Sequence, residues 1–380
     1  MKLIKFDTLY PLEYINKKIS ESQSIIDKMN FNQYHQWLVD LRMNYSDFYT
    51  YNLNEYGWEA EEFFLNDDLY IEKCGKHYFG LFYHFIKIFH RFRNMLSYIS
   101  VPFKERIIEK HIKTRNPDVL FIREQVHVRS SFWERYKKDK LIVARIDCSI
   151  PKNWSPLSFE LIYTNIPSYL EFFKSNNVPV KSNSNGFEER LLPEIKKEAK
   201  IYDVSYVGGL GEYFGFADKT LTFERLIEKF ENRQNFNWWG FKTGESFGQK
   251  FPNLAETYKG STGGIEMFDI YACSKIVVND YGTGFGGIAV NQRIFEVLGT
   301  GTLLITRESE SLKGWENYLV TYKDVDDCAS KIQYYLIHEE EREKIAKAGQ
   351  AFVLENYSYF KLIGKLSEEL QEAHKSKFSK

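Results

Sequence analysis

The sequence predicts an α/β fold with two domains, and three observations lead to that prediction. The chain has 380 residues, more than one typical hydrophobic core organises. From Pro117 onward, short apolar runs alternate with helical segments, as in a parallel sheet. Glycines directly follow several of these runs, at the positions where open α/β sheets bind ligands. We therefore expect two α/β domains with a ligand between them.

The elements follow in order along the chain. The first ~110 residues have a mainly helical pattern with polar breaks. Three buried strands are then predicted in "PDVLFI" (Pro117–Ile122), "KLIVARID" (Lys140–Asp147) and "FELIYTN" (Phe159–Asn165), followed by the helix "SYLEFFKSNN". The polar segment 182–203 is interpreted as the connection between the domains.

A second α/β series begins at Asp203. Its predicted strands are "DVSYVGGL", "NFNWWGF", "KIVVND" and "TLLIT", separated by the helices "TLTFERLIEKFENR", "GGIEMFDIYACS" and "NQRIFEVLG". The remaining chain is helical almost to its end. We expect an N-terminal domain at 1–197, a C-terminal domain at 198–355, and a C-terminal helix at 356–380 that packs back on the N-terminal domain.

Composition narrows the possible functions. Apolar residues make up 43%, and 51 Lys plus Arg balance 52 Asp plus Glu, so no strongly basic surface predicts nucleic acid as a partner. The four cysteines are far apart and form no C-x-x-C pair, which fits a reducing compartment. No window reaches ~18 uninterrupted apolar residues. We expect a cytoplasmic protein.

Three glycine-rich stretches mark candidate ligand contacts. In "YVGGLGEYFGF", Gly208 and Gly209 follow a strand and let the backbone approach phosphates or sugar, although the spacing matches neither a Rossmann nor a Walker fingerprint. Gly240 and Gly260 fall at predicted strand ends, where backbone groups can meet a nucleobase edge. Each glycine taken singly is equally typical of an ordinary turn.

The third stretch, "YGTGFGGIAVNQRIFEVLGTG", combines a glycine-rich loop with a helix start. Unpaired N–H groups and the helix dipole suit a diphosphate there. Arg293 adds a permanent cation, and Glu296 lies on the same helix face, where its carboxylate can accept hydrogen bonds from ribose hydroxyls. An ordinary surface ion pair would explain both side chains but not the flanking glycines. Gly301 suits a left-handed turn after the helix.

At this point the sequence resembles a family. "RIFEVLGTGTLLIT", preceded by "SKIVVND" and followed by "HEEEREKIAKAGQAFVLENYSY", is similar to the C-terminal half of GT-B glycosyltransferases of the group 1 (family 4-like) type, and to their spore-maturation-protein-like branch in particular. "PDVLFI", "ARIDCSIP" and "ELIYTNIPSYLEFFKSNNV" resemble the acceptor-side domain of that branch. The resemblance covers roughly residues 115–365.

The resemblance implies a GT-B fold, with two Rossmann-like domains facing each other across a cleft. It also implies transfer of a sugar from a nucleotide-diphosphate sugar to a saccharide, lipid-linked or other hydroxyl acceptor. Bacterial surface polysaccharide or lipopolysaccharide assembly is the expected pathway. No cofactor is implied beyond the donor substrate.

The resemblance also implies a set of donor-binding residues in the C-terminal domain. Glu296 matches the family's ribose-binding glutamate. Ile288 occupies the position of a second glutamate, so the donor sugar must be held by other groups. The basic residue that often follows the first-strand glycines is matched by Lys219 or Arg225. The full expected set is Gly208, Gly209, Lys219, Gly240, Gly260, Gly284, Gly286, Gly287, Arg293, Glu296 and Thr302.

Candidate acceptor-side groups lie in the N-terminal domain. Asp147 follows a buried strand, and Glu124 and His127 follow another, so each is a candidate general base or positioning group. A structural polar role is the simpler interpretation of each, and a retaining enzyme would need no dedicated base. Arg123 and Arg129 can hold an anionic acceptor.

A metal site is not expected, because the histidines His77, His84 and His90 lack ligand spacing and the acidic clusters do not follow a strand. The segment His77–Leu96 is interpreted as a packed core helix in preference to a membrane-surface helix, although peripheral membrane contact would suit a lipid-linked acceptor. Two alternatives stay open: a nucleotide-sugar epimerase of the same fold, and a non-catalytic nucleotide- or carbohydrate-binding protein.

Overall fold

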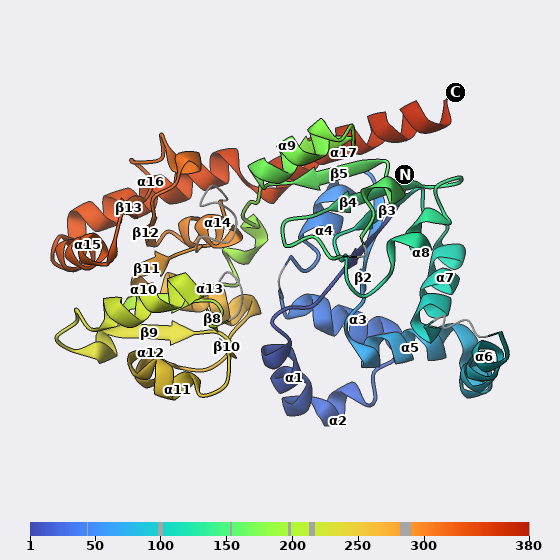
Figure 1. Cartoon of the computed structure of the whole chain (residues 1–380), viewed down its shortest axis with the longest axis horizontal. Coiled ribbons are helices and arrows are strands. Elements are labelled where there is room, and N and C mark those ends of the chain that lie inside the picture. The colour runs from blue at the N-terminus through green and yellow to red at the C-terminus, as the bar shows by residue number, and fades with distance from the viewer. Residues whose placement is uncertain are drawn as a thin grey trace. The chain divides into compact units, whose positions relative to one another are not determined.

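The computed structural model describes residues 1–43, 45–97, 102–152, 154–196, 199–212, 217–281 and 290–379. The chain forms two compact units (Figure 1). Unit 1 comprises residues 1–164, 172–181 and 363–380, and unit 2 comprises residues 165–171 and 182–362. Each unit is built on a parallel sheet covered by helices, as the sequence predicts.

Unit 1 contains a parallel sheet of order β2-β1-β3-β4-β5-β6. Its strands are β1 (Lys2–Asp7), β2 (Glu59–Phe64), β3 (Val119–Ile122), β4 (Leu141–Arg145), β5 (Leu161–Thr164) and β6 (Val180–Ser182). Its helices are α1 (Leu12–Glu21), α2 (Gln23–Ile26), α3 (Phe31–Asp40), α4 (Phe48–Glu55), α5 (Asp68–Phe79), α6 (Tyr83–Ser97), α7 (Phe103–Arg115) and α8 (Ser130–Glu134). Helices α9 (Pro167–Ser175) and α17 (Tyr359–Phe378) contribute residues to both units.

Strands β1 and β2 correct the expectation of a mainly helical start. Strand β1 carries Lys5 and Asp7 among apolar residues, so its sequence pattern does not predict a buried strand. Lys5 lies 2.9 Å from Glu62 of β2 and 3.1 Å from Asp7, and all three are buried. Because these charges compensate one another, a polar strand can occupy the inside of the sheet.

The segment His77–Leu96 also differs from its expected form. It is interrupted: α5 ends at Phe79, a short 3₁₀ turn covers Gly80–Phe82, and α6 begins at Tyr83. Helix α6 buries Tyr83 and His90 but exposes Phe85, Ile88 and Phe89, so the interpretation as a packed core helix is wrong. Among the described residues, no helix is long and apolar enough to cross a membrane.

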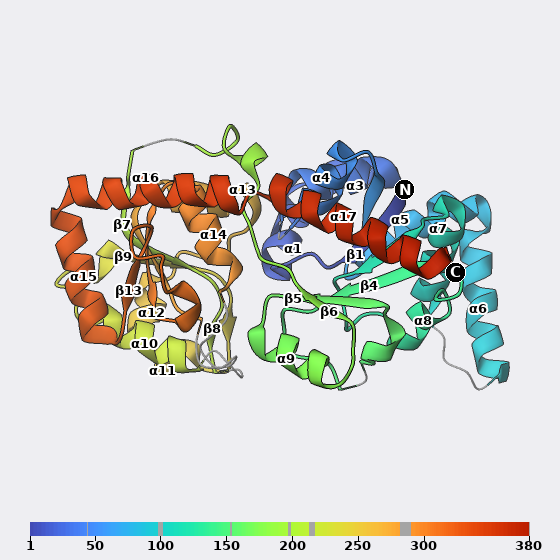
Figure 2. The same ribbon diagram turned by 90° about the horizontal axis from the view of Figure 1, so that it is seen from above.

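Unit 2 contains a parallel sheet of order β13-β12-β11-β7-β9. Its strands are β7 (Tyr202–Val207), β9 (Phe236–Trp239), β11 (Ser274–Asn279), β12 (Leu303–Arg307) and β13 (Val320–Tyr322), with the small pair β8 (Leu210–Gly211) and β10 (Lys242–Thr243) beside them. Its helices are α10 (Ala217–Ile227), α11 (Phe247–Lys250), α12 (Pro252–Thr257), α13 (Gly264–Ala272), α14 (Gln292–Gly299), α15 (Val325–Ile337) and α16 (Glu339–Asn356). Helices α15, α16 and α17 follow one another at the C-terminal end of the chain (Figure 2).

Helix α14 is fixed by an apolar face. Ile294, Val297 and Leu298 are fully buried, as the 3.6-residue period predicts. The helix ends at Gly299, and Gly301 adopts φ 75°, the left-handed turn expected there. This packing fixes the direction in which the side chains of Arg293 and Glu296 leave the helix.

Candidate active site

The sheet order of unit 2 creates a switch point between β7 and β11. The chain runs from β7 to β9 on one side and then crosses to β11 on the other. Open α/β sheets bind ligands beyond the carboxyl ends of the strands at such a point. Gly208 follows β7 and Asp280 follows β11, so the candidate donor site lies around these two residues.

Three of the predicted glycines meet at this edge. The Gly208 amide donates to the Trp239 carbonyl at 2.9 Å, and the Gly240 amide donates to the Gly260 carbonyl at 3.0 Å. A methyl group on Gly240 would collide with the Gly208 carbonyl oxygen. The strand ends therefore form a surface of closely packed backbone atoms, and the space beside Gly260 is open to a ligand.

Arg293 lies under this surface. Its Nη1 donates to Asn279 Oδ1 at 2.7 Å, and its guanidinium carbon lies 5.0 Å from the centre of the Tyr206 ring. A methyl group on Gly208 would collide with its Nη2. Its Nε is buried with no hydrogen-bond partner among the described residues. Arg293 is thus a fixed cation at the switch point with an unused hydrogen-bond donor, which a phosphate group can accept.

Glu296 lies one turn beyond Arg293 and is only 9% exposed. Burial raises its pKa to about 7, although Arg293 and a hydrogen bond from Gln292 oppose the shift. Burial also works against the charge of Arg293, but Tyr206, Tyr271 and Glu296 together raise the pKa of Arg293 above its ordinary value. A carboxylate in this position can accept hydrogen bonds from a diol such as ribose.

Lys219 is a second cation at this edge and is buried in the first turn of α10. Burial lowers its pKa to about 7, Arg293 lowers it further, and Asp280 opposes both effects. The two cations repel each other, and an anionic ligand removes that cost. Of the two basic residues expected to follow the glycines, Lys219 has this position, whereas Arg225 is exposed on α10.

The sequence did not identify Asp280, which organises the neighbouring strand ends. This fully buried carboxylate accepts from Arg307 Nε and Nη2 at 2.9 and 2.8 Å and from the Tyr322 hydroxyl at 2.9 Å, and Arg307 also donates to Thr222 at 3.0 Å. The signal was the polar pair Asn279–Asp280 that ends a buried strand. Asp280 joins the ends of β11, β12 and β13. Its negative charge also raises the pKa of Lys219, against the effects of burial and Arg293.

Two hydroxyl groups beside Gly260 were also missed. Ser261 Oγ and Thr262 Oγ1 are buried without a hydrogen-bond partner in the described part of the chain. They lie between Gly260 and the start of α13, close in sequence to the glycine surface. Unsatisfied hydroxyls of this kind are available to a ligand.

The other expected donor residues lie elsewhere. Gly209 packs against the Phe241 ring. Thr302 precedes β12, at the edge of the sheet opposite Gly208, where its hydroxyl donates to the Tyr271 carbonyl at 2.7 Å and accepts from Lys200 at 3.1 Å. Gly284, Gly286, Gly287 and Ile288 fall outside the described residues.

In unit 1, Glu124 and His127 form a pair after β3. Both carboxylate oxygens of Glu124 accept from the His127 amide at 2.8 Å, and His127 Nδ1 lies 2.9 Å from Glu124 Oε1. The His127 side chain is 39% exposed. A proton on Nδ1, held by Glu124, leaves Nε2 as the basic atom, which is the arrangement of an oriented general base.

Asp147 has a different environment. It forms a short ion pair with Arg145, which is fully buried and also donates to the Tyr49 hydroxyl. The unit-1 switch point, between β1 and β3, is filled by Arg123, whose Nη1 lies 3.5 Å from Asp7. Because the Asp147 carboxylate is held by the Arg145 guanidinium while the His127 ring is partly exposed, the geometry favours His127 over Asp147 as the acceptor-side group.

Known proteins add two kinds of finding. Residues 219–366 match the model of a family described as "Glycosyl transferase-like". The matched segment lies mostly in unit 2. It contains Lys219, Asp280, Arg293 and Glu296, and it supports the predicted enzyme class, a glycosyltransferase. No curated protein matches the sequence.

Solved structures match nearly the whole chain. Sucrose-phosphate synthase from Thermosynechococcus elongatus is 9% identical with a TM-score of 0.57, covering 98% of each chain. Anabaena HepE in complex with UDP and glucose is 12% identical with a TM-score of 0.53, covering 98% of this chain and 99% of that one. A UDP-N-acetylglucosamine 2-epimerase from Listeria monocytogenes, so named provisionally, is 10% identical with a TM-score of 0.51, covering 100% and 96%. These similarities confirm the predicted GT-B fold class.

Proposed function

We propose that the chain transfers a sugar from a nucleotide-diphosphate sugar to a saccharide or lipid-linked hydroxyl acceptor. The observation that carries the proposal is the pair of cations at the unit-2 switch point, half-buried Arg293 and buried Lys219, beside the backbone surface of the strand ends. As the glycosidic bond breaks, charge grows on the leaving diphosphate, and fixed cations in a dry site stabilise it. The UDP bound in the HepE structure supports a nucleotide donor.

Glu296 is proposed to hold the ribose, and the backbone at Gly240 and Gly260 to meet the base. Ser261 and Thr262 supply two further hydroxyls beside that backbone. On the acceptor side, His127 oriented by Glu124 is proposed as the group that receives the hydroxyl proton in an inverting reaction.

The proposed setting is bacterial surface polysaccharide synthesis at the inner face of the membrane. Resemblance of "DVSYVGGL" and "RIFEVLGTGTLLIT" to the spore-maturation-protein-like branch supports that assignment. A nucleotide-sugar epimerase is the second candidate, because the Listeria epimerase has a similar fold.

A ligand screen followed by turnover tests the proposal. Thermal unfolding is measured with UDP, GDP, ADP and CMP, since a ligand of the native state raises the melting temperature. The sugar nucleotides of the stabilising base are then incubated with the protein, with and without a mixture of saccharide acceptors. Transfer that requires an acceptor supports the proposal. An altered sugar without any acceptor identifies an epimerase, and stabilisation with neither reaction identifies a binding protein.

A further inference from the structure

Helix α6 turns its apolar side away from the protein. Counting 100° per residue, the buried Tyr83 and His90 and the half-buried Asn94 share one side of the helix. The opposite side, an arc of roughly 120°, carries an apolar stripe of five residues between 52% and 67% exposed: Phe85, Ile88, Phe89, Phe92 and Met95. The preceding turn extends the stripe with Leu81 and Phe82, which are 100% and 68% exposed.

This orientation is set by packing. The Tyr83 ring lies against Gly75 of α5, where a methyl group would collide with it. The His90 ring lies 5.3 Å from that of Phe103 of α7. Helices α5, α6 and α7 therefore form one group within unit 1, visible in both Figure 1 and Figure 2. Rotating α6 to bury its stripe would expose Tyr83 and His90, so the stripe is a fixed part of the surface.

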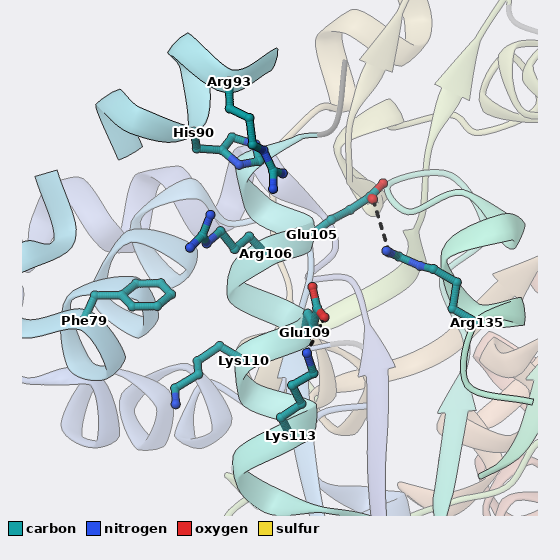
Figure 3. A pocket seen from close by; sticks show the side chains of 9 residues that line it. All are labelled: Phe79, His90, Arg93, Glu105, Arg106, Glu109, Lys110, Lys113 and Arg135. Atoms are coloured by element: carbon teal, nitrogen blue, oxygen red, sulfur yellow. Dashed lines mark hydrogen bonds and ion pairs between the residues drawn. The ribbon is translucent and has the colours of Figure 1, made fainter. Parts of the chain in front are cut away.

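Cations border the stripe. Arg91 and Arg93 are exposed and lie on its two flanks. Next to Arg93, α5, α6 and α7 enclose a pocket of about 480 Å³. In Figure 3, Arg106 and Lys110 project from α7 on the side facing Phe79, while Arg93 comes from α6 above them.

The acidic residues of this pocket are already neutralised. Glu105 pairs with Arg129 and Arg135 at 3.3 and 3.6 Å, and Glu109 pairs with Lys113 at 2.6 Å. In contrast, Arg106 and Lys110 have no carboxylate within ion-pair distance among the described residues. The pocket thus offers net positive charge to an external anion.

We propose that α6 is a membrane-docking helix that lies in the surface of an anionic lipid bilayer. The apolar stripe enters the region of the acyl chains, and Arg93, Arg106 and Lys110 bind lipid phosphates. Exposed aromatic and aliphatic side chains bordered by Lys and Arg are the signature of an interfacial helix, which lies on the membrane without crossing it. A protein partner would not need cations on both flanks of the stripe, whereas a surface of anionic headgroups matches them.

This surface also lies near the candidate acceptor residues of unit 1. Arg129, two residues after His127, pairs with Glu105 of the pocket. Docking would hold segment 124–129 close to the lipid headgroups. If the proposed transfer reaction holds, this position favours a lipid-linked acceptor over a soluble saccharide.

The test is co-sedimentation of the full chain with two kinds of vesicle. One contains phosphatidylcholine alone, and the other also contains about 30% phosphatidylglycerol, which gives a clearly negative surface. Phe85→Ser with Phe89→Ser is expected to lower the partition coefficient at least ~10-fold on both vesicle types. Arg106→Gln with Lys110→Gln is expected to lower the partition coefficient about 10-fold or more on anionic vesicles only. Salt at roughly 0.5 M, which shortens the screening length, should abolish this difference.

Matched controls come from unit 2. Ile337→Ser removes an apolar side chain that is 79% exposed, and Lys344→Gln with Lys347→Gln removes two exposed cations of α16. These variants should bind vesicles like the wild type. Nucleotide binding by every variant, measured by thermal shift, reports that each remains folded and separates this test from that of the transfer reaction.

Two outcomes would overturn the proposal. One is vesicle binding that is absent in the wild type or unchanged in both α6-region variants. The other is a wild type that is dimeric by light scattering and becomes monomeric with Phe85→Ser and Phe89→Ser without ever binding vesicles, which would make the stripe an interface between two copies of the chain.

Discussion

Lys219 makes donor binding depend on pH in a way that the structure specifies. In the free protein its pKa is lowered to about 7, chiefly by burial and secondly by Arg293, whereas Asp280 opposes the shift. A bound diphosphate adds negative charge beside it and restores the protonated form. Binding above pH 7 must therefore take up close to one proton, and affinity must fall as pH rises.

The size of the effect follows from the two pKa values. If the diphosphate returns Lys219 to its ordinary value of 10.5, affinity falls by roughly 15-fold between pH 7 and pH 8.5, and by about tenfold per pH unit beyond that. The terminal phosphate of UDP, with a pKa near 6 (about the value of other phosphate monoesters), is already ionised over most of this range. Glu296, with a pKa of about 7, is half ionised at the lower end of this range and about 90% ionised one pH unit higher.

Isothermal titration calorimetry measures this directly. Titrations of the nucleoside diphosphate at pH 8 in buffers of different ionisation enthalpy give the number of protons taken up. Lys219→Met should bind more weakly at pH 7 and lose the pH dependence, and Arg225→Met on the same helix should retain it. Proton uptake near zero in the wild type, or the same pH dependence in Lys219→Met, would refute the assignment of Lys219 to the diphosphate.

Four further outcomes are expected. The raised pKa of Glu296 contributes stability that is lost as pH rises from 4.5 through about 7, so Glu296→Gln should be more stable than the wild type at pH 8, by up to about 3 kcal/mol in chemical denaturation, while binding the donor less tightly. His127→Asn should lower the rate of transfer about 100-fold or more, with donor affinity unchanged by calorimetry, whereas an equal loss of donor affinity would contradict an acceptor-side role. Asp147→Asn should destabilise the fold, measured as a lower melting temperature, because it leaves buried Arg145 without its ion-pair partner. Gly240→Ala should cost about 1–3 kcal/mol of stability and weaken donor binding, since its methyl group collides with a neighbouring carbonyl; normal donor affinity would show that this backbone surface is not used.

The unit-2 elements could be predicted because their residue patterns are local. "KIVVND" and "TLLIT" became β11 and β12, and the period of Ile294, Val297 and Leu298 placed α14 correctly. The meeting of Gly208 with Arg293 was not predictable, because it depends on which strands become neighbours. Asp280 was missed for the same reason: its partners Arg307 and Tyr322 come from other strands.

In unit 1, the sequence failed where long-range charge compensation outweighs local pattern. Lys5 and Glu62 make β1 and β2 look polar, yet they satisfy each other across the sheet. For helix α6 the prediction from sequence was wrong in the opposite direction, since an apolar pattern proved to be exposed. Its apolar stripe looks like that of any core helix, and only the positions of Gly75 and Phe103 decide that Tyr83 and His90 face inward.

Arg293 and Lys219 are proposed to form a diphosphate site at the unit-2 switch point. The most direct test is calorimetric titration with a nucleoside diphosphate and with its parent nucleoside. The diphosphate is expected to bind at least ~100-fold more tightly than the nucleoside to the wild type, because charge-assisted hydrogen bonds supply most of the difference. Arg293→Lys, which keeps the charge but loses the fork geometry, should reduce that preference about 10-fold or more. Equal affinity for diphosphate and nucleoside, or an unchanged preference in Arg293→Lys, would contradict a diphosphate site at Arg293 and Lys219.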